Sequence, residues 1–319
     1  MKFELDIMKT VLITGAAGFI GSHLTERLLN DGHRVIGIDN LFTGSKDNLK
    51  EASKHPQFTF IEHDIIEEFC SHKKINQIYN LACPASPIHY QENPIYTIKI
   101  NTIGVINMLE LAREKEARIL QASTSEIYGD PEEHPQKEEY RGNTSTIGPR
   151  ACYDEGKRCA ETLFYDYHRK YNLEIKIARI FNTYGPRMSL HDGRAVCNFI
   201  IQALKKEPVT LYGKGHQTRS FCFVSDLVEG LIRLMEAPGK VTSPINLGNT
   251  KEQTMRELAE LIIEMCDAKK RFIFSDLPED DPRRRCPDIT KAKILLNWKP
   301  RIAIREGLKK TIDYFKERI

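Results

Sequence analysis

The segment Lys9–Gly21, KTVLITGAAGFIG, carries the strongest structural signal in this 319-residue chain. Its first half is a continuous apolar run, which predicts a strand buried on both faces, as in a parallel sheet. Its second half is a glycine turn with the spacing GxxGxxG, which leads directly into a helix-like segment over Ile20–Asn30. Glycines at such a turn let a pyrophosphate approach the backbone amides at a helix N-terminus, because any side chain would hold it away.

Similar apolar runs recur through the first half of the chain and alternate with helix-like segments. The further predicted strands are Arg34–Asp39, Phe58–Asp64, Gln77–Ala82 and Ala117–Ser123, and the further predicted helices are Pro94–Lys115 and Tyr153–Tyr171. Strands separated by helices imply right-handed βαβ units. We therefore predict an α/β fold with a Rossmann-type doubly wound parallel sheet.

The pattern changes after Phe181, where strands become shorter and loops carry Gly, Pro and Arg. Those loops are Gly185–Arg187, Gly213–Arg219 and Pro278–Pro287, and helices are expected near residues 194–206, 225–235, 255–266 and 304–318. We predict a dinucleotide-binding domain over residues 1–185. Residues 186–319 are expected to form a smaller α/β lobe that mainly binds substrate, with some segments returning to the first domain.

Composition argues against several classes of function. The formal net charge of +3 is nearly balanced, so no nucleic-acid or membrane surface is expected. No apolar stretch approaches the roughly 18–20 residues that span a bilayer, and Met1–Lys9 has acidic residues where a signal peptide needs an apolar core. A cytoplasmic protein is expected. Its eight cysteines form no Cys-x-x-Cys pair, so structural thiols are favoured over disulfides, and no metal site is expected.

Asp39 ends the second predicted strand eighteen residues after Gly21. A carboxylate at this place accepts both ribose hydroxyls of a dinucleotide and repels the 2′-phosphate of NADP, so NAD is the expected cofactor. The alternative is an ordinary strand–turn–helix with a capping aspartate.

Tyr153 and Lys157 lie four residues apart, which places both on one face of the predicted helix. A phenol with a pKa near 10 is a poor base, but a neighbouring ammonium and the charge of a nicotinamide ring favour the phenolate. Thr124, in the hydroxyl-rich strand end Ser123–Glu126, is placed to hydrogen-bond the same substrate oxygen as Tyr153. Glycine turn, hydroxyl-rich strand end and Tyr–Lys pair, in this order, predict hydride transfer at a carbinol carbon and are typical of short-chain dehydrogenases.

The chain resembles the extended short-chain dehydrogenases that act on sugar nucleotides over its entire length, and more narrowly the UDP-glucuronate decarboxylase family. The matching segments are Leu81–Tyr90, Ser123–Pro131, Cys152–Arg158, Ala178–Met188, Gln217–Asp226 and Asp280–Lys291. The resemblance implies an NAD-dependent carboxy-lyase, UDP-glucuronate as substrate and a homodimer. The product would be UDP-xylose, formed after C4 oxidation, loss of carbon dioxide and re-reduction of C4.

The same resemblance assigns roles to individual residues. Thr124, Tyr153 and Lys157 match positions that oxidise and re-reduce C4. It implies that Ser125, Glu126 and Arg219 take part in ring distortion and decarboxylation. It also implies that Asn182, Arg219 and Arg285 line the UDP site. The cofactor positions are Gly15, Gly18, Phe19, Ile20, Gly21, Asp39, Asp64, Ala82 and Lys157. In related proteins an aspartate at position 64 meets the adenine amino group, although a surface-loop carboxylate fits the sequence nearly as well.

Three other functions remain open: a 4,6-dehydratase or a 4-epimerase on the same scaffold, and an NAD-binding regulator from another class. The related 4,6-dehydratases carry an aspartate before the glutamate to protonate a departing hydroxyl, and Ser125 cannot supply that proton. A 4-epimerase needs neither the aspartate nor the glutamate, so Glu126 would be superfluous in such an enzyme. A catalytically silent NAD-binding regulator would be free to lose Thr124, Tyr153 or Lys157, yet all three are present.

Overall fold

The computed structural model describes residues 8–277 and 282–319. The acidic N-terminal residues 1–7 and residues 278–281, which belong to the predicted loop Pro278–Pro287 and to the matching segment Asp280–Lys291, lie outside the described residues.

Seven parallel strands form the main sheet, in the order β11-β6-β5-β4-β1-β2-β3. The strands are β1 (Thr10–Thr14), β2 (Arg34–Asp39), β3 (Phe58–Glu62), β4 (Gln77–Asn80), β5 (Arg118–Thr124), β6 (Ile175–Ile180) and β11 (Ile245–Leu247). The predicted doubly wound parallel sheet is confirmed.

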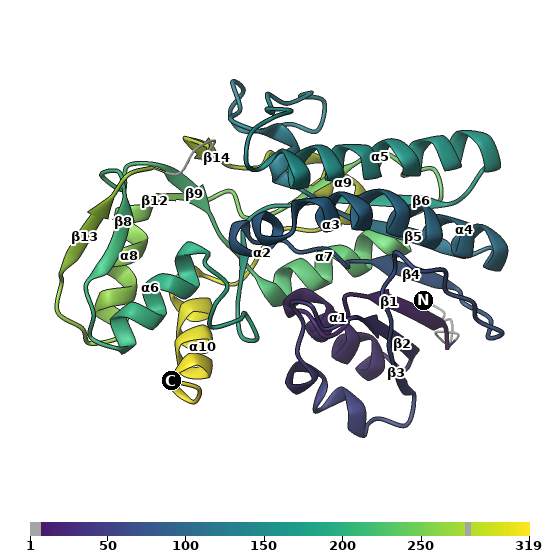
Figure 1. The fold of residues 1–319 in the computed structure, drawn as a ribbon, viewed down its shortest axis with the longest axis horizontal. Helices are drawn as coiled ribbons and strands as arrows, with labels where there is room; N and C mark the ends of the chain where they lie inside the picture. The colour runs from purple at the N-terminus through teal and green to yellow at the C-terminus, as the bar shows by residue number, and fades with distance from the viewer. Residues whose placement is uncertain (1–7, 278–281) are drawn as a thin grey trace.

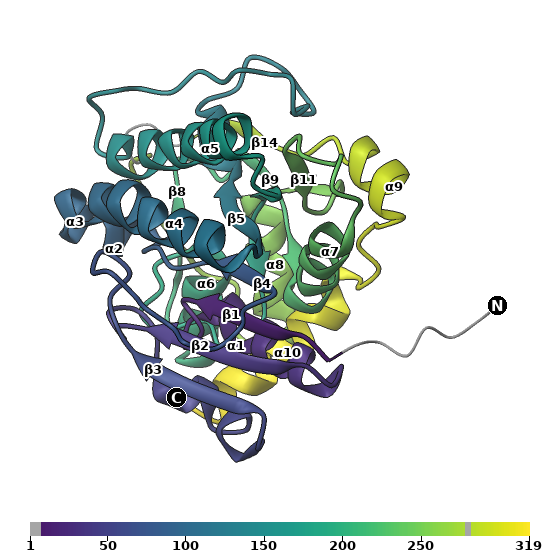
Figure 2. The same ribbon diagram turned by 90° about the vertical axis from the view of Figure 1, so that its right-hand side faces the viewer.

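Helices cover both faces of this sheet (Figures 1 and 2). They are α1 (Phe19–Asn30) and α7 (Val224–Glu236) on one face, and α3 (Pro94–Lys99), α4 (Val105–Lys115) and α5 (Ala151–Tyr171) on the other. Strand β1 shows why both faces are apolar. Leu12 belongs to the core under α4 and α5, whereas its neighbours Val11 and Ile13 belong to the core under α1 and α7. Successive side chains of a strand point to opposite faces, so a doubly covered strand needs an unbroken apolar run.

The five predicted strands of the first half are confirmed, with ends that differ by up to two residues. The predicted helix Pro94–Lys115 is confirmed as well, but a π-helical turn, η3 (Ile100–Gly104), separates α3 from α4. Strand β6 was not predicted, because Lys176 and Arg179 interrupt its apolar run. Lys176 is fully buried all the same, since its Nζ donates to the carbonyl oxygens of Pro238 and Val241 at 2.7 and 2.8 Å.

The smaller lobe lies beside the carboxyl ends of the main strands and carries the C-terminal helix (Figure 1). Its helices α6 (Ala195–Leu204), α8 (Met255–Met265) and α10 (Ile304–Lys316) agree with the predictions, as does α7 in the first lobe. The remaining elements are α2 (Pro87–Glu92), α9 (Thr290–Leu296), β7 (Thr183–Tyr184), β8 (Val209–Tyr212), β9 (Thr218–Ser220), β10 (Cys222–Phe223), β12 (Glu252–Thr254), β13 (Phe272–Ser275) and β14 (Arg284–Arg285), with short 3₁₀ turns η1 (Lys46–Leu49), η2 (Ala52–Lys54) and η4 (Ser125–Tyr128). The division at residue 185 stays a prediction.

All eight cysteines lie in the described part of the chain and are free thiols. Within the same residues, none of the helices has the length and apolar character that a bilayer crossing requires.

The glycine turn packs α1 closely against the end of β1. Gly15 has a φ of +70°, a region that favours glycine, and a Cβ on Gly21 would lie 2.0 Å from the carbonyl oxygen of Gly15. The turn therefore excludes side chains for steric reasons within the protein, in addition to the space that it leaves for a ligand.

We expect Gly21→Ala to lower the free energy of unfolding by about 1–3 kcal/mol, because the added methyl group meets a backbone carbonyl that cannot move without shifting the turn. Gly239→Ala is the matched control, since the nearest atom there is the carboxylate of Glu174 at 2.9 Å, the far end of a flexible side chain. Urea unfolding of both variants measures the difference, and equal midpoints would contradict the steric argument.

Candidate active site

A cavity of about 500 Å³ opens at the carboxyl ends of β1, β2, β4 and β5. This is the edge at which doubly wound sheets bind nucleotides. Residues of the predicted cofactor and catalytic sets line it together: Gly15, Gly18, Phe19, Ile20, Gly21, Asp39, Asp64, Ala82, Thr124, Ser125, Glu126, Tyr153, Lys157 and Asn182. They come from seven separate parts of the first 182 residues, and the ends of the parallel strands bring them to one place.

Asp39 is held at the end of β2 beside the glycine turn. Its Oδ2 accepts from the amide of Ala17 at 2.9 Å, and its Oδ1 accepts from the amide of Leu41 at 2.8 Å. Burial raises the pKa of this carboxyl, while the backbone hydrogen bonds act to lower it. The amide of Gly18 is a third backbone partner of this carboxylate. A carboxylate has about four acceptor positions, so one remains for a ligand hydroxyl. The glycine turn and Asp39 thus fit a dinucleotide whose ribose carries free hydroxyls.

Helix α5 brings Tyr153 and Lys157 to the end of β5. Lys157 Nζ donates to the carbonyl oxygen of Ala122 at 2.8 Å and lies 5.8 Å from the centroid of the Tyr153 ring. The ring of Tyr90, from α2, stacks on the Tyr153 ring with centroids 5.0 Å apart and an interplanar angle of 7°. The phenol is therefore fixed in orientation by contacts on more than one side.

The electrostatic setting of Tyr153 differs from the expectation that its neighbours favour the phenolate. Burial raises the pKa of Tyr153 well above 10, and a hydrogen bond with Thr124 acts in the opposite direction without reversing the shift. Tyr153 is only 6% exposed, and loss of solvation is the largest cause of the shift. In this environment Tyr153 is a proton donor at neutral pH.

Glu126 lies half-buried among arginines at the turn that follows β5. Arg285 approaches it with two guanidinium nitrogens at 2.5 and 2.8 Å, and Arg150 Nη1 lies 3.5 Å away. Burial acts to raise the pKa of Glu126, but the charges of Arg285 and Arg150 outweigh it and lower the pKa. Glu126 is therefore an ionised carboxylate.

Local structure fixes the position of the Glu126 carboxylate. Thr124 caps the turn η4, because its Oγ1 accepts from the amide of Glu126 at 3.2 Å. Strand β14 pairs with β9 so that Arg285 lies opposite Arg219. Arg219 is buried too, and its charge also lowers the pKa of Glu126. Neither arginine lines the cavity itself, although both were predicted to bind the substrate, whereas Glu126 does line it.

Asn182 does reach the cavity, and its Nδ2 is buried with no acceptor among the described residues. A buried amide without a partner is costly. This donor is thus available to a ligand with acceptor oxygens, as a nucleotide has.

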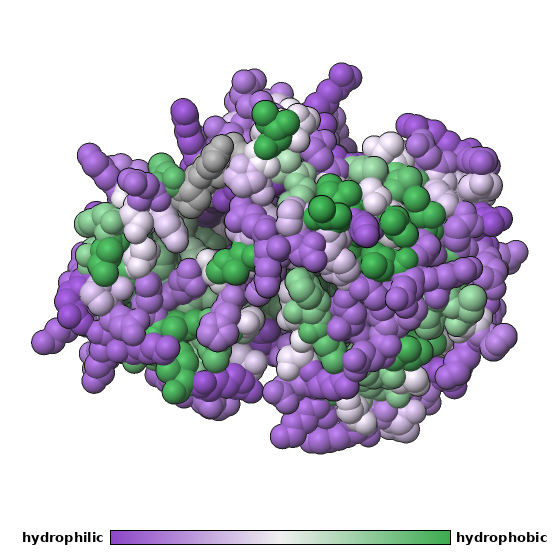
Figure 3. Space-filling model, viewed as in Figure 1, coloured by the Kyte–Doolittle hydropathy of each residue, from purple (hydrophilic) through white to green (hydrophobic). Residues whose placement is uncertain are grey.

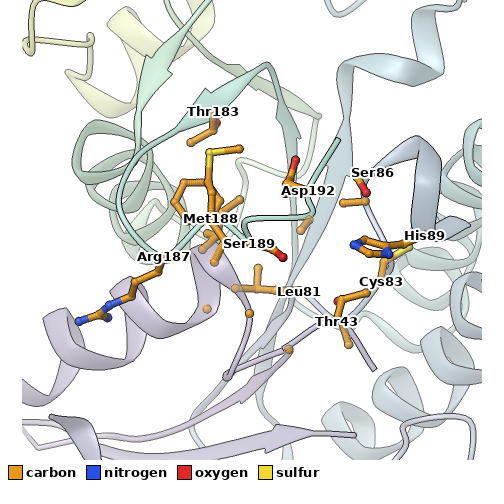
Figure 4. Close-up of a pocket in the computed structure, with 18 of the residues that line it drawn as sticks. Thr43, Leu81, Cys83, Ser86, His89, Thr183, Arg187, Met188, Ser189 and Asp192 are labelled. Atoms are coloured by element: carbon orange, nitrogen blue, oxygen red, sulfur yellow. The ribbon is translucent and has the colours of Figure 1, made fainter. Parts of the chain in front are cut away.

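Several cavity residues were not predicted from the sequence. Figure 4 shows the segment from Leu81 to His89 facing the segment from Thr183 to Asp192 across the cavity, with Arg187 pointing away toward α1. Arg187 Nη2 indeed donates to Glu26 on that helix at 2.6 Å. Tyr314 and Arg318, at the C-terminal end, complete the lining. Leu81–Tyr90 and Ala178–Met188 were matched to the family as whole segments, but only Ala82 and Asn182 were assigned to the site within them. Arg150, which contacts Glu126, was not predicted either. Its place three residues before Tyr153 in the sequence was the one feature that could have pointed to a position near the site.

Comparisons with known proteins agree with this geometry. A sequence profile of the family described as GDP-mannose 4,6 dehydratase matches residues 12–311. UDP-glucuronic acid decarboxylase 4 of Arabidopsis thaliana is 56% identical to the chain over 321 residues, which cover 100% of this chain and 72% of that protein. UDP-glucuronic acid decarboxylase 1 of Xenopus tropicalis is 53% identical over 98% of this chain and 73% of its own length.

Among solved structures, the UDP-glucuronic acid 4-epimerase of Bacillus cereus, in complex with UDP-glucuronic acid and NAD, matches with a TM-score of 0.88. It is 27% identical, and the match covers 97% of this chain and 100% of the epimerase. The chain therefore shares its fold with an epimerase, whereas its sequence is much more similar to the decarboxylases. The chain belongs to the UDP-glucuronic acid decarboxylase family within the extended short-chain dehydrogenases.

Proposed function

We propose that the chain is an NAD-dependent decarboxylase that converts UDP-glucuronate into UDP-xylose and carbon dioxide. The observation that carries this proposal is the pair Ser125–Glu126 in one cavity with Tyr153 and Lys157. Serine stands where a dehydratase needs an acid, and the adjacent carboxylate is kept ionised by Arg285. The likeness at 53–56% identity to UDP-glucuronic acid decarboxylases supports the same reading.

NAD is the proposed cofactor, held mainly by residues 1–185, with the UDP-sugar held mainly by residues 186–319. The glycine turn would receive the pyrophosphate, Asp39 the adenosine ribose, and Lys157 the nicotinamide ribose. When bound, NAD accepts a hydride from C4 of the sugar and later returns it. The chain's own residues must then position C4 and handle the protons.

Tyr153 and Thr124 would hold the C4 oxygen. Tyr153 takes the hydroxyl proton as C4 becomes a ketone and gives it back when C4 is reduced again. Burial alone favours the neutral phenol, so the base form depends on positive charge nearby. Lys157 supplies one such charge, and its hydrogen bond to Ala122 fixes where that charge lies.

Ketone formation at C4 makes the sugar carboxylate a β-keto acid. The bond between C5 and the carboxyl carbon then breaks, carbon dioxide leaves, and the electron pair moves into the C4 carbonyl to give an enolate. Tyr153 and Thr124 would stabilise the enolate oxygen as hydrogen-bond donors. A proton added at C5 completes the step. Glu126, Ser125 and Arg219 are the residues we assign to ring distortion and decarboxylation, and Asn182, Arg219 and Arg285 to the UDP side.

Arg219 must not pair too strongly with the sugar carboxylate, because only contacts that strengthen in the transition state accelerate a reaction. Arg219 lies outside the cavity lining, and its Nη1 donates to the carbonyl oxygen of Thr218 at 2.9 Å, which suits this requirement. The Glu126 carboxylate draws on the positive charge of Arg285 and Arg150, which leaves less of that charge for the substrate carboxylate.

We further propose a homodimer formed through α3 and α4. Ile95, Ile98, Ile103 and Ile106 are spaced along the outer face of these helices and are 71%, 37%, 45% and 37% exposed. Figure 3 shows hydrophobic side chains gathered over this region. An apolar helical stripe of this kind pairs most simply with its own copy about a two-fold axis.

The eight free thiols suit a reducing compartment, and we propose the cytoplasm as the site of the reaction.

Tyr153→Phe tests the proposed chemistry. We expect purified protein given UDP-glucuronate to release carbon dioxide and form UDP-xylose without net accumulation of NADH. The variant should turn over at least about a hundredfold more slowly, because it has lost its positioned acid and base. Product NMR and trapped carbon dioxide are the measurements.

Cys159→Ser, at an exposed thiol on the same helix, is the matched control and should keep normal turnover. UDP-galacturonate without gas would identify a 4-epimerase instead. Near-normal turnover of Tyr153→Phe would remove Tyr153 from the mechanism.

Asp154 gives a pH-dependent prediction about stability. Burial, followed by the charge of Glu126, raises the pKa of this carboxyl to about 8. Its Oδ1 is buried without a hydrogen-bond partner among the described residues. Between about pH 4 and pH 8 the unfolded chain has lost this proton while the folded protein retains it, so the group's contribution to stability falls as pH rises.

We therefore expect Asp154→Asn to raise the unfolding temperature at pH 7.5 by about 2 °C or more, and to raise it less at pH 4.5. Thermal unfolding of the variant and the unmodified chain at both pH values provides the measurement. A shift of the same size at both pH values would show that the effect does not arise from this proton.

Ile95→Glu combined with Ile106→Glu should convert the dimer to a monomer, because charged groups would face each other in an apolar contact. Sedimentation velocity reports the mass. Ile294→Glu on α9, at a residue 75% exposed, is the control and should leave the dimer intact. An unmodified chain that sediments as a monomer would contradict the proposed assembly.

A further inference from the structure

Three polar side chains meet where the adenine end of the dinucleotide would lie. Asn40 follows β2, Asp64 follows β3, and Tyr96 lies on α3. The Tyr96 hydroxyl donates to Asp64 Oδ2 at 2.5 Å, and Asn40 Nδ2 donates to the same oxygen at 2.9 Å. Asn40 Nδ2 also donates to the Tyr96 hydroxyl at 2.5 Å. The three groups form a closed triangle that ties α3 to the ends of two strands.

The hydrogen bonds of Asp64 leave one of its acceptor positions free. Oδ2 accepts twice, from Tyr96 and Asn40, and Oδ1 accepts once, from the amide of Ile66 at 3.0 Å. A carboxylate has about four acceptor positions, so one remains, on Oδ1. Asp64 and Asn40 both line the cavity, whereas Tyr96 does not. Tyr96 therefore acts on the cavity through Asp64.

The triangle also holds the loop that carries the ribose-binding carboxylate. Asn40 Oδ1 accepts from the amide of Phe42 at 3.1 Å, and the rings of Phe42 and Tyr96 lie 5.5 Å apart. Asp39, which accepts from the amide of Leu41, is the adjacent residue. The Tyr96 ring thus supports the loop of Asp39 through Phe42, whereas the Tyr96 hydroxyl is bonded to Asp64. Replacing Tyr96 by Phe keeps the ring and removes only the hydroxyl.

Tyr96 remains a donor throughout the usable pH range, because burial, and then the bond to Asp64, raise the pKa of its phenol. The bond to Asp64 is a hydrogen bond to an anion, a class that contributes more than bonds between neutral groups.

We propose that Tyr96 is a positioning residue for cofactor recognition: its hydroxyl fixes the Asp64 carboxylate so that the free position on Oδ1 accepts from the 6-amino group of adenine. The inference rests on the proposed use of NAD. A reaction that returns to C4 the hydride it removed is served by a dinucleotide that stays bound, and an adenine contact far from the reacting atoms can provide this retention without altering the chemistry.

The test compares NAD with nicotinamide hypoxanthine dinucleotide, which has a carbonyl in place of the adenine amino group. Affinities of dinucleotide-free protein for both are measured by calorimetry, with no turnover involved. We expect the unmodified chain to prefer NAD, and Tyr96→Phe to lower the affinity for NAD about tenfold, the scale of a lost hydrogen bond to a charged group. Affinity for the hypoxanthine analogue should change by less than about twofold, so the preference should nearly vanish.

Tyr167→Phe is the matched control, because the Tyr167 hydroxyl donates to the Glu110 carboxylate at 2.6 Å and neither residue lines the cavity. This variant should keep the preference for NAD. Equal weakening of both dinucleotides by Tyr96→Phe, or no weakening of either, would overturn the proposal, as would an unmodified chain that does not distinguish them. A chain that prefers NAD but releases no carbon dioxide would leave this inference standing and reject the decarboxylase.

Discussion

The hydrogen bond from Lys157 Nζ to the carbonyl oxygen of Ala122 fixes α5 against the end of β5, and the active-site geometry depends on it. A second contact lies one helical turn further along the same face, where Ser123 Oγ donates to Glu161 at 2.5 Å. Glu161 is itself held by two nitrogens of Arg179 from β6, at 3.0 and 2.7 Å. Buried polar groups are stable only when such networks are complete. This one fixes the helix to two strands, so Tyr153 meets Thr124 at a defined place.

Positive charge buried near Glu126 is the second constraint. An ion pair removed from water costs several kcal/mol per ion unless its geometry is good, and Arg285 provides a two-nitrogen contact with the carboxylate. Burial, and then the charge of this carboxylate, raise the pKa of Asp154 to about 8, so near neutral pH the site holds one ionised and one protonated acid.

The cofactor half of the site was largely predictable, because it is built from local signals. Gly15, Gly18 and Gly21 form one turn, and Asp39 ends the next strand, so a pattern of a few residues predicts a shared location. The Tyr153–Lys157 pair is likewise local to one helix. The pKa of Tyr153 was not predictable, because burial, the largest cause of its shift, depends on residues such as Tyr90 that are distant in sequence.

Buried apolar runs, helix periodicity and glycine spacing are properties of neighbouring residues, and the sequence alone therefore established the parallel sheet, the glycine turn and the Tyr–Lys helix. Folding decided the rest. The pairing of β14 with β9 brings Arg285 to Glu126 across 158 intervening residues, and the triangle of Asn40, Asp64 and Tyr96 joins three segments. Such contacts arise from the order of strands and the packing of helices, which no local spacing encodes. For that reason the arginine contacts of Glu126 and the hydrogen bonds that hold Asp64 form only in the folded chain.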